Sequence, residues 1–308
     1  MLSEKSPLSA TNHFFVAGGT LRYDSPSYVQ RVADDELFDL ARSGEFGYVL
    51  TARQMGKSSL MIRTSRRLKE EAGIQSVIID LTKIGTDVSV EQWYLGVLTQ
   101  LKRRLRLSVD PAQWWADQVN AGHVQRFTDY LHDVVLKEID GQIVIFMDEI
   151  DTTLNLPFSD DFFAAIRYIF NARANDPAYE RLSFVLLGVA TPADLIKDRS
   201  RTPFNIGQGI YLGDFSPIDS WVLRRGLRDI YGDEGDKVYA RIFHWTGGHP
   251  YLTQKLCLTA TENGQNTHSE TDVDNLVETL FLSKEARKET NLQFVRDSIE
   301  SSPRRSQL

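Results

Sequence analysis

Cysteine is almost absent from the sequence, because Cys257 is the only one in 308 residues. A single cysteine cannot form an intrachain disulfide, so the sequence is not that of a disulfide-stabilised secreted domain, and a reducing compartment is favoured. Long apolar runs are also lacking: none approaches the ~18–20 residues that a membrane-spanning helix needs. The N-terminal stretch has no apolar run after Lys5, which argues against a secretory signal. These absences predict a soluble, cytoplasmic protein that does not enter a membrane.

An excess of positive charge is lacking too. The 35 Lys and Arg residues are outnumbered by 42 Asp and Glu residues, which gives a net charge of −7. This balance argues against a dedicated nucleic-acid binder, and the basic clusters at Arg63–Lys69 and Lys102–Arg106 are interpreted as solvated helix faces. The hydrophobic share of 42% excludes global disorder. The length fits one large domain or two unequal ones.

Apolar runs alternate with amphipathic segments over the first two thirds of the chain, which predicts an α/β domain with a mostly parallel sheet. Helices are expected after an Asp34 cap, after the Ser89/Gln92 capping box, and throughout 110–139. Two more helices are expected at Lys57–Ala72 and Asp160–Ala174. Five short apolar runs predict the strands: 47–50, 77–79, 143–147, 184–187 and, more weakly, 210–212.

Beyond Ser216-Pro217 the pattern changes to helix after helix. We therefore expect four parts: an N-terminal arm (1–30), an α/β domain (31–213), a helical domain (214–300) and a disordered tail (301–308).

The segment between the first strand and the first long helix reads Thr51-Ala-Arg-Gln-Met-Gly-Lys-Ser-Ser59. It matches the P-loop (Walker A) pattern G-x-x-x-x-G-K-S/T except that Thr51 replaces the first glycine. Gly56 would let the backbone approach the phosphates, while Arg53, Gln54 and Met55 supply N–H groups of the loop. Lys57 would reach the β- and γ-phosphates, Ser58 would bind Mg²⁺, and Ser59 would contact the α-phosphate. A chance Gly-Lys-Ser at a helix start is the alternative, but the position between strand and helix favours a P-loop.

The strand at 143–147 ends in Asp148-Glu149. This is the expected position of the Walker B carboxylates: Asp148 would hold Mg²⁺ together with Ser58, and Glu149 would act as general base on the attacking water. Asp151, two residues on, is interpreted as a helix cap. ATP is favoured over GTP because no N-K-x-D base-reading motif is present. ATPases with a catalytic glutamate also insert a strand between the two motif strands in space, and we expect the strand at Val77–Asp80, which lies between the motifs in sequence, to take that position.

These motifs resemble the STAND (signal-transduction) ATPases, in particular the bacterial AAA-like proteins abundant in cyanobacteria. The resemblance rests on five blocks in the family's order: Tyr28–Asp34, Arg53–Leu60, Phe146–Asp151, Arg201–Gly207 and Gly247–Leu252. It covers nearly the whole chain. It implies a P-loop ATPase three-layer α/β sandwich with a five-stranded sheet, followed by a helical lid that often includes a winged helix.

The resemblance also implies further nucleotide contacts. Pro250 of the Gly-His-Pro element would lie against the adenine at the start of a lid helix, and Arg31 would lie near the base. Thr191 would be the polar sensor at the strand end, and Arg201 (or Arg199) the γ-phosphate sensor. From the residues alone, Gly247–Pro250 is a helix stop and restart, and an arginine in a polar loop is usually only solvated.

The favoured function is an ATP-driven, slowly hydrolysing signalling switch that uses ATP/ADP and Mg²⁺. Its expected partners are other copies of itself or effector and sensor proteins. Family members usually continue into repeats or an effector domain, whereas this sequence ends at Leu308. We therefore expect either that the sensor and effector are separate chains, or that this sequence is a fragment or a truncated gene product. The alternatives are a DNA-associated ATPase and a hydrolysis-deficient nucleotide-binding scaffold.

Overall fold

The computed structural model describes residues 14–195, 203–262 and 269–282. The chain divides into two compact units. One unit spans Arg31–Gly213, and the other joins the N-terminal residues up to Gln30 with the chain from Asp214 onward. The predicted tail at 301–308 lies outside the described residues. None of the helices in the described part of the chain combines the length and apolarity that a bilayer crossing needs.

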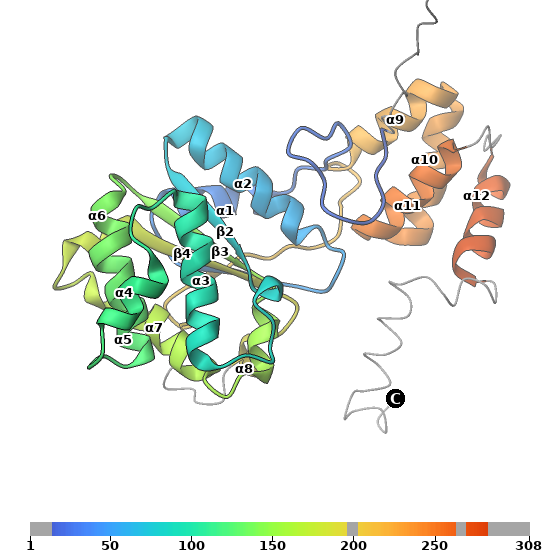
Figure 1. Cartoon of the computed structure of the whole chain (residues 1–308). Helices are drawn as coiled ribbons and strands as arrows, with labels where there is room; N and C mark the ends of the chain where they lie inside the picture. The colour runs from blue at the N-terminus through green and yellow to red at the C-terminus, as the bar shows by residue number, and fades with distance from the viewer. Residues whose placement is uncertain (1–13, 196–202, 263–268, 283–308) are drawn as a thin grey trace, which may run out of the picture. The chain divides into compact units, whose positions relative to one another are not determined.

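The Arg31–Gly213 unit, which we call the α/β unit, is built on a five-stranded sheet (Figure 1). Every strand pairing in it is parallel. The spatial order is β2-β3-β4-β1-β5. The strands are β1 (Gly47–Leu50), β2 (Gln75–Asp80), β3 (Ile143–Asp148), β4 (Leu182–Gly188) and β5 (Gln208–Gly209). The prediction of an α/β fold with a mostly parallel five-stranded sheet is confirmed.

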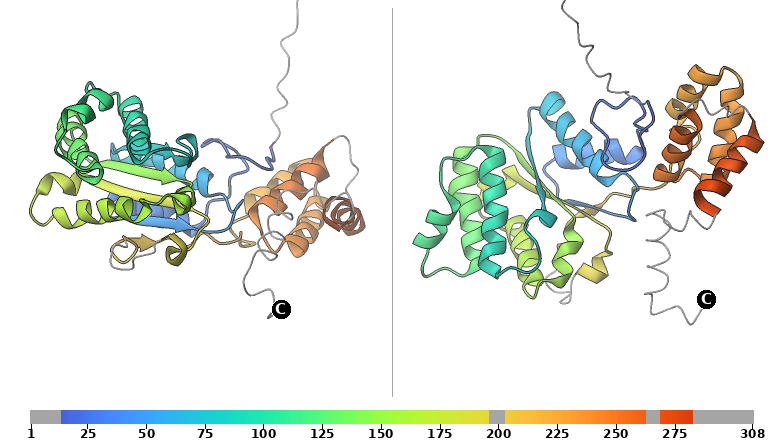
Figure 2. Two further views of the ribbon diagram at one scale, coloured as in Figure 1. Left: turned by 60° about the horizontal axis from the view of Figure 1, so that its bottom comes forward. Right: turned by 45° about the vertical axis from the view of Figure 1, so that its right-hand side comes forward.

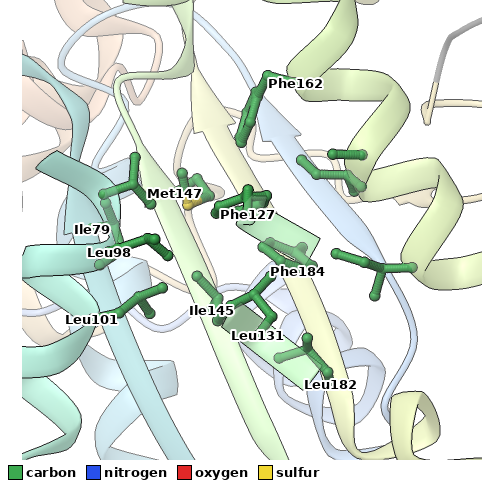
Figure 3. Close-up of a cluster of buried hydrophobic side chains, with 14 of the residues drawn as sticks. Ile79, Leu98, Leu101, Phe127, Leu131, Ile145, Met147, Phe162, Leu182 and Phe184 are labelled. Atoms are coloured by element: carbon green, nitrogen blue, oxygen red, sulfur yellow. The ribbon is translucent and has the colours of Figure 1, made fainter. Parts of the chain in front are cut away.

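Helices cover both faces of this sheet, which gives three layers (Figure 2). Along β3 the side chains alternate: Ile145 and Met147 belong to one buried cluster, and Val144 and Phe146 to the other. All of β3 and β4 is buried because both faces are covered, which explains their unbroken apolar sequences. Figure 3 shows the first cluster, where Ile145 and Met147 of β3 and Phe184 of β4 meet side chains of the covering helices.

The two covering layers differ in their helices. One contains α1 (Val32–Arg42) and α2 (Lys57–Ala72). The other contains α3 (Val90–Leu105), α4 (Pro111–Asp117), α5 (His123–Tyr130) and α7 (Ser159–Ala172). The unit also contains two short helices, α6 (Leu136–Glu138) and α8 (Pro192–Leu195). The capping box of Ser89 and Gln92 at the start of α3 is present as predicted.

Three local predictions, on a helix cap, on the extent of a helix and on the order of the strands, are wrong. Asp34 does not cap α1 but is its third residue, where its carboxylate accepts a hydrogen bond from the N–H of the true N-cap, Arg31. The segment 110–139 is not continuously helical, because the chain leaves helix between α4 and α5 at 118–122. The strand inserted between β1 and β3 is β4, whereas β2 lies at the sheet edge.

The fifth strand, predicted at 210–212, is β5 at Gln208–Gly209, paired with Gly47 and Tyr48. The apolar side chains of Ile210 and Leu212 are buried in the cluster around β1, but only residues 208–209 complete the ladder. The apolar residues therefore correctly predicted that this segment is buried, but the strand pairing with β1 begins two residues earlier than predicted.

The second unit, the helical unit, contains α9 (Trp221–Tyr231), α10 (Glu234–Thr246), α11 (Pro250–Thr261) and α12 (Glu270–Val277). The N-terminal segment has no helix or strand between residues 14 and 30 but contributes Phe15 and Val29 to the core of this unit. Gln254 of α11 fixes the segment by donating from Nε2 to the Ser27 carbonyl at 2.8 Å. The described residues of this unit include no strand, so no part of a winged helix is seen in them.

Candidate nucleotide-binding site

The loop between β1 and α2 has the backbone conformation that a phosphate-binding loop requires. Gly56 is the N-cap of α2 and adopts left-handed φ/ψ angles of 89° and 21°. A Cβ added there would lie 3.1 Å from Nη2 of Arg31, so both the conformation and the space favour glycine. The first N–H groups of α2 lack intrahelical acceptors and carry the positive end of the helix dipole. This helix start is therefore suited to bind an anion.

Lys57, the first residue of α2, is buried at 7% exposure. Its Nζ donates to the carbonyls of Thr51 and Ala52, each at 3.0 Å, so the ammonium lies across the loop that precedes the helix. Burial lowers the pKa of Lys57, and the carboxylates of Glu149 and Asp148 act against that shift. The site thus holds a desolvated cation beside two acids.

Asp148 ends β3 at 9% exposure and lies next to the loop. The Ser58 hydroxyl donates to its Oδ2 at 3.3 Å, and the N–H of Glu149 donates to Oδ1 at 3.0 Å. Burial is the main cause that raises the pKa of Asp148, with the charge of Asp80 adding to it. A hydroxyl and a carboxylate within reach of one another are the hard oxygen ligands that Mg²⁺ prefers.

These residues fit a Mg²⁺ ion that is completed by a substrate's phosphates. Within the described residues, no group of three or more His, Cys, Asp or Glu side chains could hold a metal ion on its own. Mg²⁺ in nucleotide sites typically uses one or two protein ligands plus phosphate oxygens and waters. Burial raises the pKa of Asp148 although Ser58, Lys57 and the Glu149 N–H act against that shift, and a divalent cation beside this carboxylate would favour its charged form further.

Glu149 follows β3 in a left-handed conformation, with φ 57° and ψ 45°. This backbone state is unfavourable for a residue with a side chain, so its presence at the site marks a functional candidate. Burial first, and then the charges of Asp151 and Asp148, raise the pKa of Glu149. A carboxylate with a raised pKa is a better proton acceptor than an exposed one.

Asp151 has a structural contact of its own. Its Oδ1 accepts a hydrogen bond from the N–H of Val189 at 3.1 Å, just after β4. Gly188 permits this approach, since a Cβ there would lie 2.8 Å from the same oxygen. Asp151 therefore ties the segment after β3 to the end of β4, rather than capping a helix as we expected.

Thr51 and Arg31 join the P-loop to the segment after β5. The Thr51 hydroxyl donates to the carbonyl of Leu212 at 3.2 Å. Nη1 of Arg31 donates to the carbonyls of Met55 and Gly213, at 2.9 and 3.0 Å. Thr51, which replaces the usual first glycine of the P-loop, therefore has a hydrogen-bond partner of its own. The Arg31 guanidinium lies against the backbone of the loop.

The other predicted site residues are more scattered. Arg53 is exposed, Gln54 has a left-handed φ of 63°, and Ser59 is buried. The Thr191 hydroxyl donates to Oδ2 of Asp194 at 2.6 Å, at the start of α8. Arg199 and Arg201 lie outside the described residues.

Pro250 belongs to the helical unit, where it is buried as the first residue of α11. Gly248, two residues before it, has a φ of 85°, and a Cβ there would clash with the Phe215 carbonyl oxygen. The Gly-His-Pro element therefore has structural reasons for its composition within the helical unit.

Sequence reasoning missed Asp80. This residue ends β2 and pairs in register with Asp148, so the two acids lie side by side at the carboxyl ends of neighbouring strands. Its own carboxylate accepts from the N–H and hydroxyl of Thr82 at 3.0 and 2.6 Å. The available signal was an apolar run ending in aspartate, the same pattern that identified Asp148.

Two solved structures with a similar fold come from Pyrococcus abyssi and Aeropyrum pernix. The Walker-type ATPase of Pyrococcus abyssi aligns with a TM-score of 0.56 and 17% identity, over 90% of this chain and 80% of that one. The Aeropyrum pernix ORC2 protein, in ADPNP–ADP complexes, aligns with a TM-score of 0.54 and 15% identity, over 83% and 70%. At these identities the likeness shows the fold alone.

A nearer relative exists in sequence. An uncharacterized WD repeat-containing protein of Synechocystis is 44% identical over 252 residues, or 80% of this chain. The aligned region is 21% of that protein, so this chain spans about a fifth of the relative's length. The family model described as the AAA-like domain matches residues 16–283. The chain therefore belongs to the AAA-like domain family and has the fold of a P-loop ATPase.

Proposed function

We propose that this protein binds ATP with Mg²⁺ and hydrolyses it slowly, as a conformational switch of the STAND type. The observation that carries the proposal is the meeting of the P-loop with the end of β3. There, Ser58 contacts Asp148 at 3.3 Å, and the charges of Lys57 and Glu149 interact. Ser58 and Asp148 are 90 positions apart in sequence, and the parallel topology brings them together at the carboxyl ends of β1 and β3.

Each residue then has a definite task. The N–H groups from Arg53 to Ser59 and the Lys57 ammonium bind the phosphates. When bound, Mg²⁺ supplies positive charge that stabilises the developing negative charge on the phosphoryl group. Ser58 and Asp148 would hold this ion, and Glu149 would accept a proton from the attacking water.

The choice of ATP as ligand is supported by a structural neighbour. The Aeropyrum pernix ORC2 protein, which shares the fold, is described in complexes with ADPNP and ADP. Arg31, Thr191, Arg201 and Pro250 remain proposed nucleotide contacts on the basis of family resemblance. For Arg31 we add that its guanidinium contacts the loop backbone at Met55 and would act on the nucleotide through the loop.

The switch role is supported by the much longer relative. That protein is named for WD repeats, and this chain matches only about a fifth of it. Such an arrangement is suited to an ATPase that reports its state to other domains or proteins. We therefore propose self-association, or binding of sensor and effector proteins, as the output.

Calorimetric titration with ATP and Mg²⁺ tests the binding step. We expect wild-type protein to bind and Lys57→Ala to bind at least ~10-fold more weakly, because Lys57 provides a main charge for the β- and γ-phosphates. Lys69→Ala is the matched control, since Lys69 is an exposed lysine in the last turn of the same helix. Equal ATP affinity of Lys57→Ala and Lys69→Ala would refute the P-loop assignment.

A further inference from the structure

The first residue of the α/β unit, Arg31, contacts both the P-loop and the end of the unit. Its Nη1 donates to the carbonyl of Met55 in the loop at 2.9 Å and to the carbonyl of Gly213, the last residue of the unit, at 3.0 Å. Arg31 is buried, at 7% exposure. Because hydrogen bonds from a charged donor are among the strong ones, the position of Arg31 influences the conformation of the loop.

The chain just before Arg31 is anchored in the helical unit. Val29 is 2% exposed and belongs to the core of that unit, so only Gln30 lies between a buried residue of one unit and a buried residue of the other. Ser27 is fully buried too, and its carbonyl accepts a hydrogen bond from Nε2 of Gln254 at 2.8 Å. The four steps of chain from Ser27 to Arg31 span at most ~14 Å. The anchoring of Ser27 therefore limits where Arg31 can lie.

Gln254 uses both ends of its amide for the N-terminal segment. Its Oε1 accepts from the N–H of Val16 at 3.4 Å, while its Nε2 donates to Ser27. The residue is buried in α11, at 4% exposure. The two partners decide which end of the amide is oxygen, because an N–H needs an acceptor and a carbonyl needs a donor. A carboxylate could not donate to Ser27, and an ammonium could not accept from Val16.

The second connection between the units is bonded near the same helix. Only one residue separates Gly213, which accepts from Arg31, from Phe215, which is buried in the core of the helical unit. The N–H of Phe215 donates to the carbonyl of Gly248 at 2.9 Å. Gly248 lies two residues before α11 begins, and Gln254 is the fifth residue of α11. Within the helical unit, both connections are therefore hydrogen-bonded close to the start of α11.

We propose that Gln254 is a positioning residue of the candidate nucleotide-binding site: it holds the chain at Ser27 and thereby keeps Arg31 on the Met55 carbonyl of the P-loop. This inference rests on the proposed function, because it assigns a regulator to the proposed nucleotide site. Nucleotide affinity then depends on a bond within the helical unit, and by linkage a bound nucleotide strengthens that bond by the same factor. A purely structural role for Gln254 predicts a loss of stability and nothing more.

The release of a fluorescent ADP tests this role. Gln254→Met keeps the length of the side chain but removes both bonds, and we expect release to be about 3- to 10-fold faster than from wild type. Val273→Ala is the matched control, because Val273 is a fully buried core residue of α12 in the same unit and its truncation lowers stability while the bonds of Gln254 remain. We expect this control to release ADP at the wild-type rate.

Two contrary outcomes of this experiment are distinguishable. Equal release from Gln254→Met and Val273→Ala, while wild type binds ADP, would overturn the role of Gln254 and leave the proposed function standing. If wild type does not bind ADP at all, the proposed function falls, and this inference falls with it.

A double-mutant cycle tests whether Gln254 acts through Arg31. If it does, Gln254→Met should speed ADP release in the wild-type background but change it less than about twofold in the Arg31→Ala background, because the route to the loop is already broken there. Effects of the two substitutions that simply add would overturn this route.

Hydrogen exchange in the wild-type chain gives a measurement that does not depend on how a variant folds. ADP with Mg²⁺ should slow the exchange of the Val16 N–H, which bonds to Gln254, about threefold or more. Lys57→Ala is the control, since the same ADP concentration should leave the exchange of Val16 unchanged when the P-loop no longer holds the nucleotide. An unchanged exchange rate in wild type saturated with ADP would overturn the proposal.

Discussion

At the level of single residues, the candidate site gathers charge where water is excluded. Burial lowers the pKa of Lys57 and raises the pKa values of Asp148 and Glu149. All three shifts have desolvation as their largest cause, so each charged form is disfavoured in the nucleotide-free protein. Phosphates would compensate the lysine, and a divalent cation would compensate the acids. The site is thus arranged for ligands that carry both signs of charge.

This arrangement predicts that Glu149→Gln stabilises the nucleotide-free protein at neutral pH. Burial raises the pKa of Glu149 above its ordinary value of 4.5. Between the ordinary and the raised pKa the folded state binds more protons than the unfolded state, so wild-type stability falls as the pH rises through that interval. Glutamine does not titrate. We expect Glu149→Gln to gain ~1 kcal/mol in the free energy of unfolding at pH 7 and to lose that advantage below the ordinary pKa.

Urea unfolding without nucleotide, followed between pH 4 and pH 8, measures this difference. Glu36→Gln replaces an exposed glutamate on α1 and serves as the control. A stability difference between Glu149→Gln and wild type that does not change with pH would show that the Glu149 charge carries no desolvation cost.

Much of the candidate site could be predicted at this scale, because its chemistry is local in sequence. Gly56, Lys57 and Ser58 follow a strand and open a helix, and Asp148 with Glu149 ends an unbroken apolar run. Contacts between segments far apart in the sequence, such as Arg31 with Gly213, could not be predicted. The bond of Asp151 to Val189 is missed for the same reason, since no short-range pattern encodes it.

At the level of elements, the apolar runs predicted where the strands lie in the sequence, but they did not predict which strands are neighbours in the sheet. The cores of β1 to β4 were found because buried parallel strands are apolar on both faces. The order of the sheet was not readable from the runs, which is why β2 was considered for the inserted position that β4 occupies. The helix break at 118–122 was missed because Asn120 and Gly122, the turn-forming residues there, stand between Val119 and Ala121 and no proline accompanies them.

The P-loop and the segment after β5 are held together by the side chain of Thr51. Its hydroxyl donates to the Leu212 carbonyl at 3.2 Å. Thr51→Gly restores the usual P-loop pattern but removes this bond and adds backbone freedom. We expect it to lower the free energy of unfolding by ~1–2 kcal/mol while ATP affinity changes less than about threefold.

Urea unfolding and ATP titration of Thr51→Gly and Thr51→Ser test this role. Serine keeps the hydroxyl, so Thr51→Ser should stay near wild type in stability. If Thr51→Ser is as unstable as Thr51→Gly, the bond to Leu212 contributes nothing and the threonine methyl group is what matters.

The start of α11 gives a prediction for the helical unit. Pro250 is buried at the first helical position, where its fixed φ favours helix initiation. Because the family resemblance assigns this proline to the nucleotide, Pro250→Ala should speed the release of a fluorescent ADP by about threefold or more. The change in backbone entropy alone is only ~1 kcal/mol, so the α/β unit should remain folded.

Pro217→Ala is the matched control, because Pro217 lies in the same unit and is exposed. Stopped-flow release of the fluorescent ADP compares the two variants. Identical release from both would leave Pro250 with a role only in starting α11.

At the scale of the whole molecule, the chain passes twice between its two units, at residues 30–31 and 213–214. Arg31 and Gly213, the first and last residues of the α/β unit, are joined by a hydrogen bond of 3.0 Å, and the same guanidinium nitrogen contacts the P-loop at Met55. If nucleotide binding moves the P-loop, as the switch proposal requires, Arg31 would link that movement to both places where the chain leaves the α/β unit.

The switch proposal predicts that a protein trapped with ATP differs in assembly from one without it. Glu149→Gln removes the general base but leaves Asp148 to hold Mg²⁺, so ATP turnover should fall ~10²–10⁴-fold while ATP affinity is retained. A ligand shifts an equilibrium only by its differential affinity for the two states, and ATP that persists should favour the self-associated form.

Turnover and light-scattering mass, measured on the same samples with excess ATP and Mg²⁺, test both halves of this prediction. Asp151→Asn is the control for removing a nearby charge, because asparagine keeps the oxygen that accepts from Val189 and should retain turnover within a few-fold. Equal turnover of Glu149→Gln and wild type would remove Glu149 from the mechanism. Lost turnover with an unchanged mass would support ATP hydrolysis by Glu149 but refute self-association as the output. The switch would then have to act on a different partner protein.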